Sequence, residues 1–222
     1  MNTRPRVSDL GVKIGILEHG EINSITDVEN VSVGNKTLIK GSGKLTIGSG
    51  PIRTGVTAIL PHQENIFQKK ITGYVHVLNG FGKAIGFSQV TELGVIESPI
   101  LLTNTLNSWT VADALVDYTT GENKGVFSFN PIVGECNDSF LNDIIGRHIK
   151  SPDVIYAIKN AKLNSCEEGS IGAGTGMTGF GWKGGIGTSS RICEIDSSKY
   201  TVGCLTLTNT GDPREFRIGG IQ

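Results

Sequence analysis

The chain has 222 residues and a nearly balanced charge, with 20 Lys and Arg against 21 Asp and Glu, and only 6% of its residues are aromatic. This composition lacks the basic surface with interleaved aromatic residues that nucleic-acid binders use, so we expect no nucleic-acid partner. No apolar run follows the arginines near the N-terminus, and no stretch of about 18 apolar residues occurs, so we expect no signal peptide, no membrane association and a cytoplasmic protein.

Four cysteines occur without a CxxC pair, at Cys136, Cys166, Cys193 and Cys204. This spacing is unlike that of structural zinc sites, and a cytosolic setting disfavours disulfides. We therefore expect buried free thiols, with no metal and no other cofactor. No repeat, linker or low-complexity segment divides the chain, so residues 1–222 are predicted to form a single domain.

Strands are predicted where apolar residues alternate with polar ones or form short continuous runs. In chain order these segments are residues 24–28, 31–33, 55–60, 74–78, 98–103, 126–133, 191–195 and 200–208. Helices are predicted at residues 109–120, 138–147 and 151–163, where apolar periodicity follows a capping residue. Strands with helices between them indicate a layered α/β domain.

Residues 169–187 contain nine glycines, a density that permits positive φ angles and close backbone approach. Gly172 and Gly174 do not form a dinucleotide loop, because no helical periodicity follows them. Lys183 is followed by Gly184, so the segment does not fit a phosphate-binding Walker motif either. We expect a tightly packed glycine-rich strand pair, which could also line a substrate site.

No local arrangement supplies an activated nucleophile. Ser189 and Ser190 have no histidine nearby, the four histidines are scattered along the chain, and no GxSxG elbow occurs. We interpret both serines as turn residues.

Polar residues follow the predicted strand at 126–133, where ligands commonly bind in α/β sheets. Glu135 could hold an amine cation by a charge-assisted hydrogen bond, or it could form a surface ion pair or cap a helix. Asn137 and Asp138 lie beside it. Asn209 ends the last alternating strand, where its amide could donate to an oxyanion or simply make a turn.

Several blocks in this order resemble the DmpA-type aminopeptidases, the L-aminopeptidase/D-esterase and β-peptidyl aminopeptidase family. The matching blocks are Ile25-Thr-Asp-Val, Arg53-Thr-Gly-Val-Thr-Ala-Ile-Leu-Pro61, Leu101-Leu-Thr-Asn-Thr105, Pro131-Ile-Val-Gly-Glu135, Leu141-Asn-Asp143, Gly174-Thr-Gly-Met177, Lys183-Gly-Gly-Ile-Gly-Thr-Ser-Ser-Arg191 and the strand end at Asn209. The resemblance covers nearly the whole chain.

The resemblance implies a four-layer αββα sandwich, similar to N-terminal-nucleophile hydrolases but with different connectivity. It implies a self-cleaving serine aminopeptidase acting on short peptides, amides or esters, in which the N-terminal serine of a separate β chain is the nucleophile. Asn209 matches the oxyanion-stabilising asparagine, and Glu135 matches the acid that receives the substrate amine. Asn137 stands where the founding member has an active-site tyrosine.

The resemblance also implies that this sequence is the α chain, that a β chain from the same precursor completes it, and that αβ units assemble into a homo-oligomer. Residues 79–83, Asn-Gly-Phe-Gly-Lys, depart from the family's Asn-Gly-Asn-Gly-Glu, so we expect a different substrate preference or oligomer contact. The alternatives are an acyltransferase of the ornithine acetyltransferase type, with a threonine nucleophile, and a non-catalytic binding protein of the same fold.

Overall fold

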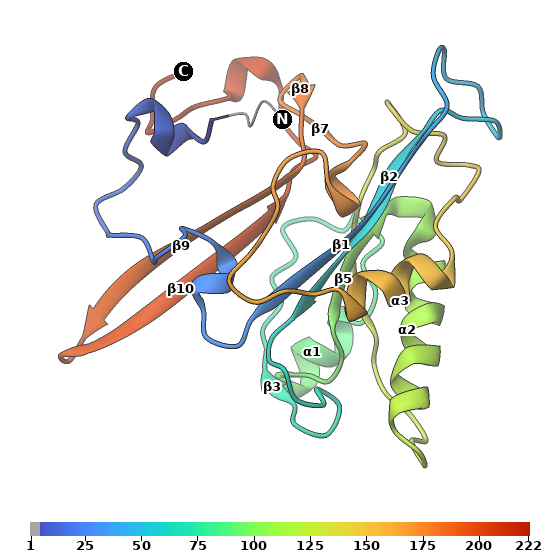
Figure 1. Cartoon of the computed structure of the whole chain (residues 1–222), viewed down its shortest axis with the longest axis horizontal. Helices are drawn as coiled ribbons and strands as arrows, with labels where there is room; N and C mark the ends of the chain where they lie inside the picture. The colour runs from blue at the N-terminus through green and yellow to red at the C-terminus, as the bar shows by residue number, and fades with distance from the viewer. Residues whose placement is uncertain (1–4) are drawn as a thin grey trace.

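The computed structural model of the protein describes residues 5–222 and is built on a four-stranded sheet of order β1-β2-β5-β6 (Figure 1). Its strands are β1 Ser32–Lys40, β2 Ile52–Leu60, β5 Ile100–Asn104 and β6 Ile132–Cys136. The first three strands are antiparallel neighbours, whereas β5 and β6 run parallel. The carboxyl ends of β5 and β6 therefore lie at the same edge of the sheet.

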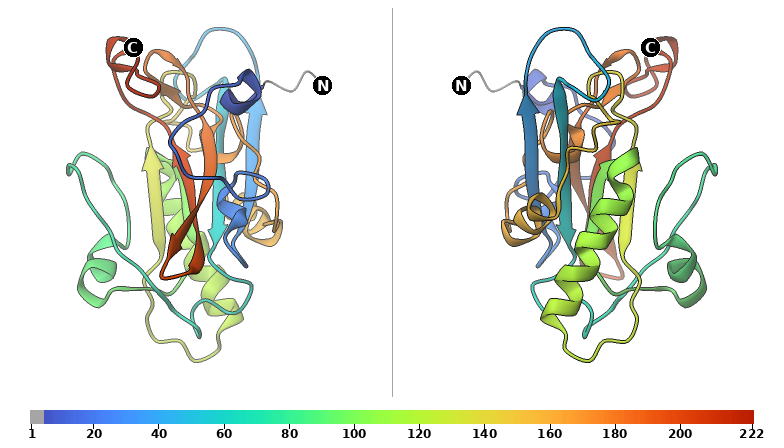
Figure 2. Two further views of the ribbon diagram at one scale, coloured as in Figure 1. Left: turned by 90° about the vertical axis from the view of Figure 1, so that its left-hand side faces the viewer. Right: turned by 90° about the vertical axis from the view of Figure 1, so that its right-hand side faces the viewer.

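Two helices, α2 Ser108–Glu122 and α3 Ser151–Lys159, cover one face of this sheet (Figure 2, right). The apolar core lies between these helices and the sheet. Its fully buried side chains include Val56, Leu101, Val111, Leu115, Val133, Ile149 and Val154. The α2 helix follows a short 3₁₀ turn, η3 Thr105–Asn107, in which the Asn104 side chain accepts a hydrogen bond from the Asn107 N–H. A strand, a capping asparagine and a helix thus follow one another without a loop.

A long hairpin of β9 Ile186–Ile195 and β10 Ser198–Leu207 lies on the opposite side of the sheet (Figures 1 and 2). Its outer surface is open to solvent: Tyr200 and Val202 are each more than half exposed. The described residues thus supply three of the expected layers, namely the helices, the sheet and the hairpin.

The glycine cluster packs between the sheet and the start of β9. Its 3₁₀ turn, η4 Gly172–Gly174, contacts β1, β2, β5 and β9. Gly172 has a φ of +49°, and a Cβ there would lie 2.3 Å from both Asn35 Oδ1 and Thr57 Oγ1. Only glycine fits this position, because both the space and the backbone conformation exclude a side chain. The expected close packing of this segment is confirmed.

The remaining elements are short. They are η1 Val7–Leu10, η2 Ile25–Asp27, β3 Ile71–Thr72, α1 Phe87–Leu93, β4 Val95–Ile96, β7 Thr178–Gly179, β8 Trp182–Lys183 and η5 Pro213–Glu215. β3 pairs with β4, and β7 pairs with β8. The short β7–β8 hairpin directly precedes β9 in the chain.

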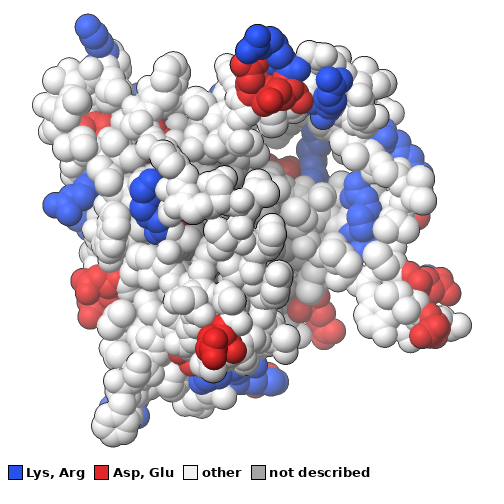
Figure 3. All heavy atoms as spheres, turned by 180° about the vertical axis from the view of Figure 1, so that it is seen from behind, with Lys and Arg blue, Asp and Glu red and all other residues white. Residues whose placement is uncertain are grey.

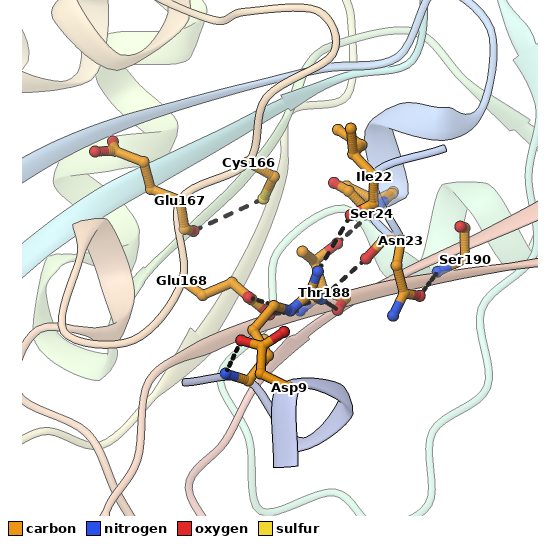
Figure 4. A network of polar contacts seen from close by, with 12 residues as sticks. Asp9, Ile22, Asn23, Ser24, Cys166, Glu167, Glu168, Thr188 and Ser190 are labelled. Carbon is orange, nitrogen blue, oxygen red and sulfur yellow. Dashed lines mark hydrogen bonds and ion pairs between the residues drawn. The ribbon is translucent and has the colours of Figure 1, made fainter. Parts of the chain in front are cut away.

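Arg6 links the segment before η2 to the long hairpin through hydrogen bonds and an ion pair. Its guanidinium donates to the carbonyl oxygens of Asn23 and Thr188 and pairs with Glu168 at 2.9 Å. The Glu168 carboxylate also accepts from the Thr188 N–H, so three distant segments meet at one network (Figure 4). Such a network holds the N-terminal segment against β9.

Two predicted elements are absent because polar side chains bond to the backbone instead. Within residues 24–28 the chain forms η2 rather than a strand, and Ser24 and Asp27 make a reciprocal capping box at this turn. Residues 138–147 form turns rather than a helix. There Asn142 accepts from the Arg53 N–H and Asp143 from the Gly48 N–H, so both side chains tie this loop to the β1–β2 hairpin.

Other predictions differ in extent. Residues 74–78 pair with no neighbouring strand among the described residues, β6 begins at Ile132 rather than 126, α3 ends at Lys159, and α1 is unpredicted. The cysteines are free as expected, but three are only half-buried and Cys204 is exposed.

Charged side chains of both signs are interspersed over the face shown in Figure 3. Within residues 5–222, no helix combines the length and apolar character needed to cross a membrane.

Candidate active site

The ends of β6 and β10 meet, although they are more than 70 residues apart in the chain. Cys136 Sγ lies 3.6 Å from the Leu207 carbonyl oxygen, and the Asn137 N–H donates to Asn209 Oδ1 at 3.2 Å. The pKa of the Cys136 thiol is raised to about 11, mainly by burial and secondarily by the charge of Glu135. This thiol is therefore protonated near neutral pH and is a poor nucleophile.

The Asn209 carboxamide is oriented at both ends. Its Oδ1 accepts from the Asn137 N–H, and its Nδ2 donates to the Thr178 carbonyl oxygen at 3.2 Å. These opposite partners distinguish the oxygen from the nitrogen of the amide. An amide nitrogen carries two hydrogens, so one N–H of Asn209 remains to donate to a ligand.

Glu135, the fourth residue of β6, is also held in place. Its Oε1 accepts from the Lys83 N–H at 2.8 Å, and its Oε2 accepts from the Thr105 hydroxyl. Thr105 begins η3 at the end of the parallel neighbour β5, so the common edge of β5 and β6 brings the two side chains together. A carboxylate has about four acceptor positions, which leaves room for a cation.

The structure brings Asn209 to Asn137, which directly follows the strand that carries Glu135. Asn209 contacts the Asn137 backbone, and Glu135 precedes Asn137 by two residues, which is about 7 Å of extended chain. The Asn137 side chain itself is exposed, and its Oδ1 accepts from the Ser139 N–H in a local turn. Its link to Asn209 is made by the backbone.

Asp138 turns inward directly after this site. Its side chain is 0% exposed, and its Oδ1 accepts from Asn142 Nδ2 at 3.0 Å. Burial raises the pKa of this carboxyl, and the hydrogen bond from Asn142 opposes the shift only in part. The neutral form of the Asp138 carboxyl is therefore favoured more strongly at this buried position than it is in water.

Ser190 is a buried strand residue rather than the turn residue that we expected. Its hydroxyl donates to Asp27 Oδ2 at 2.6 Å and accepts from the Gly20 N–H, so it fastens η2 to β9. Ser189 also lies on β9, not in a turn. In the part of the chain that the structure describes, no group of three or more His, Cys, Asp or Glu side chains could hold a metal ion.

The profile of peptidase family S58 matches residues 23–222. The chain belongs to this family. It is 41% identical over 221 residues to the β-peptidyl aminopeptidase BapA of Sphingosinicella xenopeptidilytica, a match that spans 98% of this chain but 54% of the relative. The chain thus spans about half the length of the curated relatives it matches.

Solved structures of the same fold confirm the expected class. The PH0078 protein of Pyrococcus horikoshii has a TM-score of 0.95 and 52% identity over 97% of this chain and 62% of its own. The L-aminopeptidase D-Ala-esterase/amidase of Ochrobactrum anthropi, a prototype of the serine aminopeptidases and a variant of the N-terminal-nucleophile hydrolase fold, has a TM-score of 0.89 and 34% identity over 98% and 61%. This S58 chain is therefore an α/β protein of that class.

A cleft of about 1550 Å³ opens between the sheet and the long hairpin of this S58 chain. Figure 3 shows the surface hollowed between the main body and the part that carries the hairpin. Its lining combines apolar and cationic side chains, including Val12, Ile39, Phe140, Arg53, Lys183 and Arg191. Glu135, Asn137 and Asn209 are not part of this lining; Lys183 belongs to the hairpin whose Thr178 holds Asn209.

Sequence reasoning missed Thr105, Thr178 and Lys183 as parts of the site. Thr105 stands 30 residues from Glu135, and Thr178 stands 31 residues from Asn209. The only available signal for Thr105 was its position after Asn104, at the end of a buried strand whose neighbour carries Glu135.

Proposed function

We propose that this chain is the α chain of a serine aminopeptidase that releases N-terminal residues from short peptides, amides or esters. The observation that carries the proposal is the doubly oriented Asn209 amide, whose remaining N–H can meet a developing oxyanion. Its neighbour Glu135 is suited to bind the free amine of the substrate. The peptidase family and the aminopeptidase relatives support this reaction class.

The amine site selects the end of the substrate. Glu135 is held by Thr105 and Lys83, so its carboxylate is positioned before the substrate arrives. An ammonium group gains a charge-assisted hydrogen bond there, whereas the neutral amide of an internal peptide bond gains much less. Cleavage is therefore confined to the first residue of a peptide.

The nucleophile in this proposal is the N-terminal serine of a β chain cut from the same precursor. Its own α-amine accepts the hydroxyl proton, because an α-amine with a pKa of about 7.7–8.0 is partly neutral near pH 7. The serine oxygen attacks the carbonyl carbon, and Asn209 stabilises the resulting oxyanion. The amine leaving group then takes the proton, and water hydrolyses the acyl-enzyme ester.

The cleft and the open hairpin surface support the presence of this second chain. Tyr200 and Val202 leave apolar surface bare on β10, and the cleft separates the hairpin from the sheet. We propose that the β chain covers this surface and supplies the remaining helical layer, and that the resulting αβ units form a homo-oligomer.

The first test combines intact-mass spectrometry with enzyme kinetics, both performed on the complete gene product. Two chains, the second beginning with serine, should replace a single precursor. With alanine and β-alanine p-nitroanilides as substrates, Asn209→Ala should lower kcat about 10²–10³-fold and leave KM nearly unchanged.

Asn160→Ala is the matched control, because the Asn160 amide also donates to a backbone carbonyl, that of Tyr156 on α3, far along the chain from the site. An uncut, active polypeptide would exclude the proposed nucleophile. An Asn209→Ala variant as active as Asn160→Ala would exclude the oxyanion role.

A further inference from the structure

Lys183 occupies an unusual place beside the site. It is the last residue of β8, and its ammonium donates to the carbonyl oxygen of Gly174 at 2.9 Å and to that of Gly184 at 2.6 Å. Gly174 ends η4, the turn that packs against the main sheet. One lysine side chain therefore ties the β7–β8 hairpin to a turn fixed on the sheet.

The same hairpin orients Asn209. Thr178 is the direct cross-strand partner of Lys183, and its carbonyl oxygen accepts from Asn209 Nδ2. The hairpin has only two residues in each strand, and a two-stranded ribbon of this size is not rigid by itself. The position of the Thr178 carbonyl therefore depends on what holds the hairpin.

The chain beyond Lys183 continues this connection to the site. Gly184 and Gly185 run beside Thr208, which precedes Asn209; the Thr208 N–H donates to the Gly185 carbonyl at 3.2 Å, and the Gly185 N–H donates to Thr208 Oγ1 at 3.0 Å. A Cβ on Gly184 would lie 2.8 Å from the Thr208 carbonyl oxygen, so the two backbones are in contact. Displacement of Lys183 would thus reach Asn209 from two directions.

We infer that Lys183 is a positioning residue for Asn209: it clamps the β7–β8 hairpin to η4 so that the Thr178 carbonyl holds the Asn209 amide toward the oxyanion. The inference rests on the proposed function. It goes beyond the proposed function by assigning a role to a lysine whose ammonium donates to two backbone carbonyls. Its effect falls on kcat, because the oxyanion develops only in the transition state.

A double-mutant cycle tests this role in the complete αβ protein, with alanine p-nitroanilide as substrate. Lys183→Met should lower kcat about tenfold with KM within about twofold, since misplacing an oriented group weakens transition-state contacts more than substrate binding. In the Asn209→Ala background the same substitution should change kcat by less than about twofold, because the group that it positions is gone.

Two further variants separate the clamp from a general loss of structure. Lys183→Arg retains donors for the two carbonyls and should recover most of the lost kcat. Lys150→Met is the matched control, because the Lys150 ammonium also donates to a backbone carbonyl, that of Arg147, in another part of the chain. Its kcat should equal that of the wild type.

The outcomes are distinct. Unchanged kcat in Lys183→Met, or an equal tenfold fall in the Asn209→Ala background, would overturn the clamp while leaving the proposed function intact. Full kcat in Asn209→Ala alone would overturn the oxyanion assignment, and with it this inference. If Lys183→Met does not accumulate as folded protein, Lys183→Arg and Lys183→Gln are compared in the same cycle, and a fall in kcat that is independent of Asn209 again overturns the clamp.

Discussion

The two sides of the main sheet are built in different ways. The side under α2 and α3 is packed with branched aliphatic residues, and Leu101, Leu115 and Val133 are completely buried. The side facing the long hairpin is packed by glycine backbone and polar bonds, and it opens into the cleft. The first side is a closed apolar core, whereas the second leaves apolar surface exposed. Two kinds of packing, by aliphatic side chains and by glycine backbone, thus lie on opposite faces of one sheet.

The largest expected effect tests the closed apolar core. Leu115→Ala should lower the free energy of unfolding by about 2–5 kcal/mol, because it removes a buried side chain and leaves a cavity. Val202→Ala, on the exposed hairpin surface, should cost much less in the isolated chain. Urea unfolding measures both, and equal losses would contradict the contrast between the two sides.

The next effect tests the glycine-packed side. A Cβ on Gly176 would lie 2.1 Å from the Arg53 carbonyl oxygen, so Gly176→Ala should destabilise the fold by about 1–3 kcal/mol through overpacking. Gly121→Ala is the control, because Gly121 lies in α2 with open space around its Cα and alanine favours helix. If both variants unfold at the wild-type urea midpoint, the glycines are not required by packing.

A smaller effect concerns the amine site. Thr105→Val removes the hydroxyl that donates to Glu135 while keeping the side-chain volume similar. We expect KM for alanine p-nitroanilide to rise about tenfold, since a hydrogen bond to a charged group is worth about 1.5–3 kcal/mol. Thr105→Ser should restore the wild-type KM. A fall in kcat with unchanged KM would instead place Thr105 at the reacting carbonyl.

The smallest effect is a dependence of stability on pH that originates at Asp138. Burial raises the pKa of this carboxyl in the folded protein above the ordinary value of 3.8, so the folded state holds the proton more firmly than the unfolded chain does. Its stability contribution is complete below the unfolded value and is lost as pH rises through the folded value. The wild type should therefore lose stability relative to Asp138→Asn as pH increases, measured by urea unfolding. A constant difference would show that Asp138 does not titrate in this way.

Local patterns predicted the parts of the fold that local forces determine. The helix at α2 follows from its apolar periodicity after Asn104, α3 follows from Ser151-Pro-Asp, and the β9–β10 pair follows from clean alternation. The apolar spacing after Asp138 predicts a helix, but the chain forms turns there. Its Asn142 and Asp143 instead bond to the backbone of the β1–β2 hairpin, about 90 residues away.

The same distinction applies to the candidate site. Residue type and strand-end position, together with the family resemblance, identified Glu135, Asn137 and Asn209. The groups that orient them were not predictable from local sequence, because Thr105, Lys83 and Thr178 reach the site only through strand neighbours distant in the chain. Backbone contacts, such as the Asn137 N–H to Asn209, carry no residue-type signal at all.

The hydrogen bonds that hold η4 on the sheet also have a consequence for the order of folding. The Gly172 N–H donates to Thr37 Oγ1 across 135 residues of sequence, and the Ala173 N–H donates to Thr57 Oγ1 across 116. Closing such long loops before other contacts form is entropically costly, whereas β1 and β2 pair across a short connection. We therefore expect the strand pair to form early and the glycine turn to dock onto it late. In this order the side of the sheet that faces the long hairpin is completed after the strand pair on which it rests.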